Sequence, residues 1–133
     1  MKIEDILNEK DVTPSLLTER YGFKAFKSGQ VIRVNSAPDK VNLYNADFTA
    51  SFIFSDNVMK RIILTPLIKD ITAPDYPTPE YQEIKRSYCT DVLCEAFGKP
   101  DDGWELPGYK INCYLISEGK DEYCGRNITI EMK

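Results

Sequence analysis

The feature that most constrains this chain is residues 78–98, because their pattern is that of one long helix. Thr78 is suited to cap the first turn, and Pro79 fits the first helical position, where the missing N–H of proline has no consequence. Gly98 favours the end of a helix. The sequence therefore predicts a helix over about 79–97, and the other elements must pack around it.

Apolar residues recur in this helix at intervals of three and four positions, which predicts one buried stripe. Lys85 falls within the stripe by its angle, and we expect its ammonium group to reach water past Tyr81 and Tyr88. Cys89 lies beside the stripe and is expected to be buried as a small apolar residue, whereas Cys94 points to the polar side of the helix. The residues of the predicted stripe are Tyr81, Ile84, Tyr88, Val92 and Ala96.

The clearest hairpin lies in residues 47–67, where apolar and polar residues alternate on both arms. A two-residue turn would set Ile62 opposite Ser51, an apolar residue opposite a polar one. A three-residue turn over 55–57 sets Ile62 opposite Ala50 and keeps both apolar sets on one face. The pattern therefore favours the longer turn.

The remaining segments predict two short N-terminal helices, further strands before the long helix, and two strands after it. For the last two strands, a register that sets Ile111 opposite Ile128 aligns their apolar residues, and residues 101–107 are assigned to a loop. This order predicts an α+β fold: an antiparallel sheet of about five or six strands, with the long helix on one face.

The composition indicates one globular domain. The chain has 133 residues, of which 42% are apolar and 29% are charged, so we expect residues 1–133 to form a single domain. No apolar run is as long as a membrane span, and acids interrupt the apolar residues at the N-terminus. We therefore expect a cytoplasmic protein with no secretory signal and no membrane partner.

The cysteines and the missing histidines bear on metal binding and catalysis. The four cysteines have no C-x-x-C spacing, and no histidine is present to complete a mixed zinc site, so we expect free thiols and neither a metal nor another cofactor. Histidine is also the commonest general base, so an enzyme here would depend on a cysteine or a carboxylate pair. The sequence favours a non-catalytic protein.

Charge is distributed unevenly along the chain. Residues 70–105 contain nine acidic and three basic residues, a net charge of −6, whereas the whole chain carries −4. An acidic surface steers a basic protein towards it, and aromatic side chains within that surface anchor the contact. Nucleic acid is not expected as a partner, because phosphate binding requires basic stripes. The predicted surface consists of Asp75, Tyr76, Glu80, Glu83, Asp101, Asp102 and Trp104.

Two alternatives to this acidic surface remain open. Trp104 can instead fold back onto the core, which would leave the acidic loop before it as an ordinary solvated turn. The chain can also be a small-molecule binder with a pocket between sheet and helix, lined by Tyr81, Lys85, Tyr88 and Tyr109. The leading hypothesis is a protein-binding domain, of which a bacterial toxin-neutralising (immunity-type) protein or a regulatory binder is an example. The oligomeric state stays open.

Overall fold

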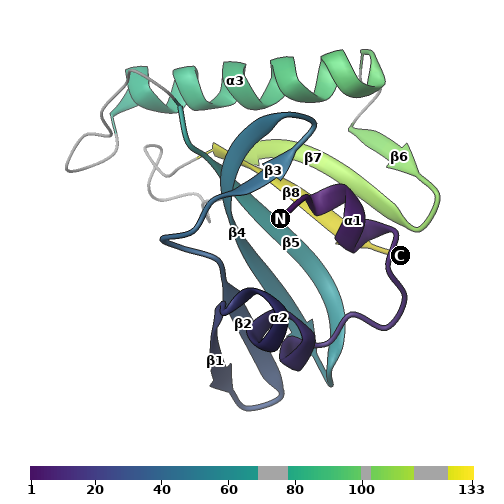
Figure 1. Cartoon of the computed structure of the whole chain (residues 1–133). Helices are drawn as coiled ribbons and strands as arrows, with labels where there is room; N and C mark the ends of the chain where they lie inside the picture. The colour runs from purple at the N-terminus through teal and green to yellow at the C-terminus, as the bar shows by residue number, and fades with distance from the viewer. Residues whose placement is uncertain (69–77, 100–102, 116–125) are drawn as a thin grey trace.

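The computed structural model describes residues 1–68, 78–99, 103–115 and 126–133. Within these ranges, two short helices precede five strands, and a long helix precedes three more (Figure 1). The helices are α1 (Ile3–Leu7), α2 (Pro14–Tyr21) and α3 (Pro79–Phe97). The strands are β1 (Lys24–Ser28), β2 (Val31–Asn35), β3 (Val41–Leu43), β4 (Ala46–Ser55), β5 (Val58–Pro66), β6 (Trp104–Leu106), β7 (Tyr109–Leu115) and β8 (Arg126–Met132).

The helix ends follow local side-chain chemistry. The Thr78 hydroxyl accepts a hydrogen bond from the Tyr81 backbone N–H at 3.1 Å at the start of α3. The Thr13 hydroxyl accepts one from the Leu16 N–H at 3.2 Å at the start of α2. Each cap satisfies a backbone donor that has no partner within the helix, and a proline follows each. The predicted span of α3 and both N-terminal helices are confirmed.

All eight strands of the described chain join one antiparallel sheet, in the order β1-β2-β4-β5-β8-β7-β6, with β3 paired to β4. The α+β class is confirmed, but the sheet has more strands than the expected five or six. One reason is β6, Trp104–Leu106, which lies in the segment assigned to a loop. Its three residues are too few to show an alternating pattern, and only pairing with β7 makes them a strand.

The predicted turn and register of the β4–β5 hairpin are wrong. Ser55 pairs with Val58, so the turn has two residues, and Asp56 and Asn57 both adopt the left-handed conformation, with φ of 53° and 64°. The register shifts after Phe54, which pairs with Met59. This β-bulge adds one residue to β5 and returns the apolar residues of both strands to one face. If the register is assumed to be unbroken, alignment of the apolar residues of the two strands favours the three-residue turn.

The predicted register of β7 and β8 is also wrong. Ile111 pairs with Ile130 rather than with Ile128, which is opposite Cys113. The error is a shift of two residues. Because strand side chains alternate with a period of two, Ile111, Ile128 and Ile130 still share one face, as predicted. The predicted turn between these strands lies outside the described residues.

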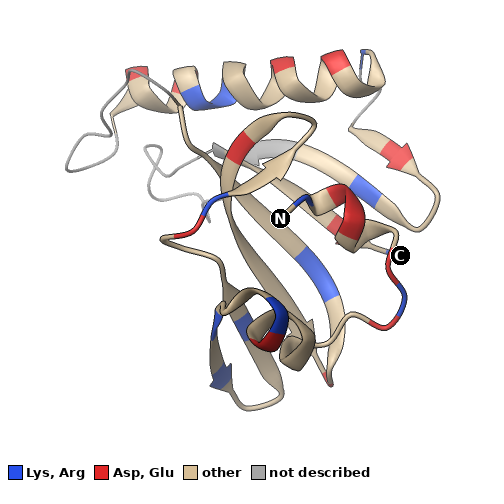
Figure 2. Ribbon diagram, viewed as in Figure 1, with Lys and Arg blue, Asp and Glu red and all other residues tan. Residues whose placement is uncertain are grey.

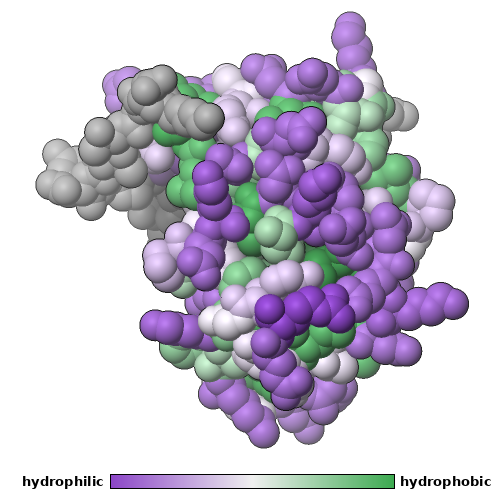
Figure 3. Space-filling model, in the orientation of Figure 1, coloured by the Kyte–Doolittle hydropathy of each residue, from purple (hydrophilic) through white to green (hydrophobic). Residues whose placement is uncertain are grey.

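The core lies between the helices and one face of the sheet. Along β4, alternate residues from Ala46 to Phe54 are buried. Their burial is shared with α1 and α2, which lie in front of the sheet in Figure 1, and with α3, whose Tyr88 ring packs against Phe48 at a centroid distance of 6.0 Å. The opposite face of the sheet is called the open face below. In Figure 3, hydrophilic surface covers much of the side that carries α1 and α2, with hydrophobic patches between.

The predicted stripe of α3 is rotated from the observed one. The buried residues of the helix are Gln82, Lys85, Cys89 and Leu93. Ile84 is 39% exposed and Ala96 is also exposed, whereas Tyr88 and Val92 flank the buried line and are half-buried. The expected burial of Cys89 is confirmed. Gln82 and Lys85 are polar, so a search for apolar residues at helical spacing does not select the buried face of α3.

Candidate functional site

One row of side chains crosses the open face of the whole sheet. Its members lie opposite one another on seven successive strands, so their side chains are cross-strand neighbours. All of them are exposed or half-buried. From β1 to β6 the row is Phe26, Arg33, Ile53, Arg61, Glu131, Lys110 and Glu105.

The β8–β7–β6 end of this row is balanced in charge. Glu131 lies between Arg61 and Lys110, and Lys110 lies opposite Glu105. The Lys110 ammonium is 3.9 Å from one Glu105 oxygen, and the Lys133 ammonium is 2.7 Å from the other. Lys133, followed by Lys110, lowers the pKa of Glu105. These charges neutralise one another locally.

The β1–β2–β4 end has no such balance. Phe26 is 57% exposed and Val31 is 44% exposed, and the two side chains share the open face on neighbouring strands. Arg33 lies between Phe26 and Ile53, and no acidic residue occurs in β1 or β2. Figure 2 shows basic positions and no acidic one on these two strands. We call this surface the basic–apolar face; it consists of Lys24, Phe26, Val31, Arg33, Ile53 and Arg61.

Sequence reasoning missed this face, although one signal was available. Residues 23–35 contain Lys24, Lys27 and Arg33 without an acid, so this segment is as one-sided in charge as the acidic one. The side chains that complete the face, Ile53 and Arg61, come from the next hairpin. Their position beside Arg33 depends on strand pairing that cannot be read from composition.

The predicted acidic surface is described only in part. Asp75, Tyr76, Asp101 and Asp102 lie outside the described residues. Glu80 is exposed in the first turn of α3. Glu83 is exposed too, and its carboxylate lies 3.0 Å from the Arg86 guanidinium, which offsets its charge locally.

Trp104 belongs to the core rather than to an exposed surface. Its side chain is 8% exposed, and the indole Nε1–H donates a hydrogen bond to the Gly98 carbonyl at 2.9 Å. This bond satisfies a carbonyl at the end of α3. Trp104 therefore joins β6 to the end of the helix, as in the alternative interpretation that folds it back onto the core. Binding through the remaining residues of the predicted acidic surface stays a prediction.

The side chains of the predicted helix–sheet pocket make other contacts. Lys85 is buried, with 6% of its surface exposed, so, contrary to the expectation from the sequence, it does not extend into water. Its ammonium lies 5.8 Å from the centre of the Tyr81 ring, and burial lowers the pKa of Lys85. Burial raises the pKa of Tyr88, whose ring packs against the sheet. Tyr109 lies on β7 opposite Met132. Small-molecule binding by these four residues stays a prediction.

The thiols and carboxylates of the described residues are the remaining groups that could bind a metal or react. Cys89 is buried and Cys94 is partly exposed. Within the described ranges, Asp, Glu and Cys side chains form no group of three that could hold a metal ion. No helix in the same ranges is both long and apolar enough to cross a membrane.

No protein-family model, curated protein or solved structure matches this chain.

Proposed function

We propose that this chain is a non-catalytic domain that binds another protein through the basic–apolar face. The observation that carries the proposal is the juxtaposition of exposed Phe26 and Val31 with Arg33, on strands without acidic residues. Exposed aromatic side chains beside arginine are the composition typical of binding hot spots.

The chemistry of this face favours an acidic partner. Lys24 and Arg33 provide positive charge on β1 and β2, strands without an acidic residue. Arg61 continues this row on β5, where Glu131 lies opposite it. Such charge raises the rate of association with an acidic surface, and burial of an apolar side chain against Phe26 then slows dissociation. This partner differs in sign from the basic protein expected from the acidic segment.

The test is affinity capture from a lysate of the source organism with the wild-type chain and three surface variants. Phe26→Ser and Arg33→Glu alter the proposed face, and Glu80→Lys alters the acidic start of α3. All three positions are exposed, so the variants are expected to fold. Captured proteins are identified by mass spectrometry after washes at low and high salt.

We expect an acidic protein that is captured by the wild type and by Glu80→Lys but not by Phe26→Ser or Arg33→Glu. High salt should weaken its retention, because screening reduces attraction between exposed charges. A basic protein that Glu80→Lys alone loses would support the acidic surface instead. Capture of no protein by the wild type would contradict a protein-binding function.

A further inference from the structure

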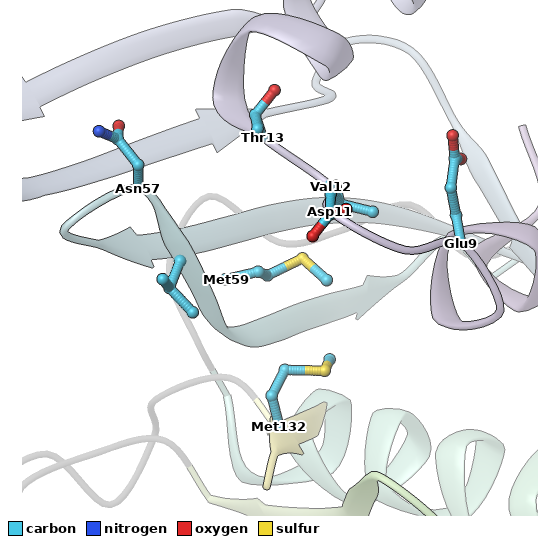
Figure 4. A pocket seen from close by; sticks show the side chains of 8 residues that line it. Glu9, Asp11, Val12, Thr13, Asn57, Met59 and Met132 are labelled. Atoms are coloured by element: carbon cyan, nitrogen blue, oxygen red, sulfur yellow. The ribbon is translucent and has the colours of Figure 1, made fainter.

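A pocket of about 310 Å³ lies where the linker between α1 and α2 passes over the ends of β5 and β8 (Figure 4). Its volume is at the lower end of the range for small-molecule sites. The lining residues come from three places in the sequence: the linker, the β4–β5 turn with the start of β5, and the end of β8. They are Glu9, Asp11, Val12, Thr13, Asn57, Val58, Met59 and Met132.

The floor of this pocket is apolar and adaptable. Met59 and Met132 extend from neighbouring regions of the sheet with their thioethers in the same space, and Val12 lies above them (Figure 4). Val58 adds a side chain that is 55% exposed. Methionine side chains are flexible and polarisable, so they adjust to ligands of different shape.

One carboxylate gives the pocket its charge. Glu9 also lines the pocket, but both of its oxygens accept hydrogen bonds from the Arg20 guanidinium, at 2.9 and 3.1 Å. Asp11 is exposed and takes part in none of the ion pairs between described residues. Its carboxylate lies on the side of the linker that faces the methionines in Figure 4. Its backbone φ of 57° is left-handed, a conformation that aspartate tolerates better than most residues.

We propose that this pocket binds a small organic cation, an amine on a short apolar body. The apolar body would contact Met59, Met132 and Val12, and the ammonium would pair with the carboxylate of Asp11. A neutral analogue would bury the same area without the ion pair, and an anionic analogue would be repelled by Asp11. The ligand class follows from the apolar floor and the one uncompensated charge.

The test uses the full chain labelled with ¹³C at the methionine methyl groups. The chain has three methionines, of which two line the pocket, while Met1 lies at the start of the chain and serves as an internal control. Protonated 2-phenylethylamine is titrated first, followed by the neutral 2-phenylethanol and the anionic 3-phenylpropanoate. We expect saturable shifts of Met59 and Met132 with the amine, and weaker shifts with the other two.

Two matched variants isolate the charge. Asp11→Asn removes the proposed partner, and Asp56→Asn removes a carboxylate from another exposed position with φ near the same value, 53°. We expect Asp11→Asn to weaken amine binding about threefold to fivefold, as for an exposed ion pair, and Asp56→Asn to leave it unchanged.

Three outcomes would overturn the proposal: no saturable shift at Met59 and Met132, an equal shift at Met1, or equal affinities of the amine for wild type and Asp11→Asn. Stronger binding of the anion than of the amine would do so as well. Because asparagine tolerates a positive φ as aspartate does, the variant is expected to keep the linker conformation.

Discussion

At the scale of single residues, Gly103 and Gly108 show how space decides the effect of the same substitution. Both have a positive φ, 87° and 89°, so alanine is strained to a similar degree at either position. A Cβ at Gly103 would collide with the Asn112 side chain and lie 2.9 Å from the Ile111 carbonyl oxygen, whereas a Cβ at Gly108 meets nothing within 4 Å.

We therefore expect Gly103→Ala to reduce the free energy of unfolding by about 1–3 kcal/mol more than Gly108→Ala does, because only the first variant forces its neighbours to move. Urea denaturation of both variants measures the difference. Equal losses of stability would show that Asn112 moves aside without a penalty.

Lys85 is a second residue whose contribution to stability depends on its surroundings. Its burial lowers the pKa of the ammonium, so the folded chain holds this proton less tightly than the unfolded chain. Stability should therefore rise with pH between the folded and the unfolded pKa of Lys85. Lys85→Met, which keeps the length of the side chain, should stabilise the protein by about 1 kcal/mol at neutral pH.

This gain should shrink as the pH rises from the folded pKa towards the ordinary pKa of lysine, because the buried side chain is then the neutral amine and no charge is buried on folding. Thermal unfolding at a series of pH values tests it, with Lys27→Met as a control at an exposed position. A less stable Lys85→Met at neutral pH would mean that the contact with the Tyr81 ring outweighs the loss of hydration.

At the scale of elements, local signals in the sequence predict the ends of helices better than the pairing of strands. Thr13 and Thr78 accept hydrogen bonds from residues three positions further along the chain, so these caps can be predicted from the local sequence. The register of β4 and β5 depends on a bulge, and that of β7 and β8 on pairing along the whole strands. The candidate face escaped prediction for the same reason, since Arg33 and Arg61 become neighbours only through Ile53.

The extra residue of the β-bulge should be dispensable for the pairing of β4 and β5. Met59 pairs with Phe54 and Arg61 pairs with Ile53, so Lys60 has no opposite residue on β4. Deletion of Lys60 should leave the pairing on both sides unchanged and alter the free energy of unfolding by about 1 kcal/mol or less.

Deletion of Ile63, a matched change three residues further along, should prevent folding because it moves Leu64 from the core to the open face. Circular dichroism and cooperative unfolding distinguish the two outcomes. Loss of folding in both variants would mean that the bend made by the bulge is essential to the sheet.

At the scale of the whole molecule, the last strand of the fold holds the sheet together. β8 lies between β5 and β7, so it joins the part formed by β1–β5 to the part formed by β6 and β7. It also contributes Ile128 and Ile130, both fully buried, and it contacts α3. Each buried isoleucine accounts for about 2–5 kcal/mol by comparison with alanine variants, against a total stability of about 5–15 kcal/mol for a typical domain.

Deletion of residues 126–133 should therefore abolish the cooperative unfolding transition, and not merely fray one edge of the sheet. Deletion of Lys133 alone is the control, since its exposed ion pair with Glu105 contributes about 1 kcal/mol or less. Both chains are compared by calorimetry with the wild type. If the chain without residues 126–133 still unfolded in one cooperative transition, the elements β1–β5 with α1 and α2 would form a stable unit alone, and the basic–apolar face would not depend on β8.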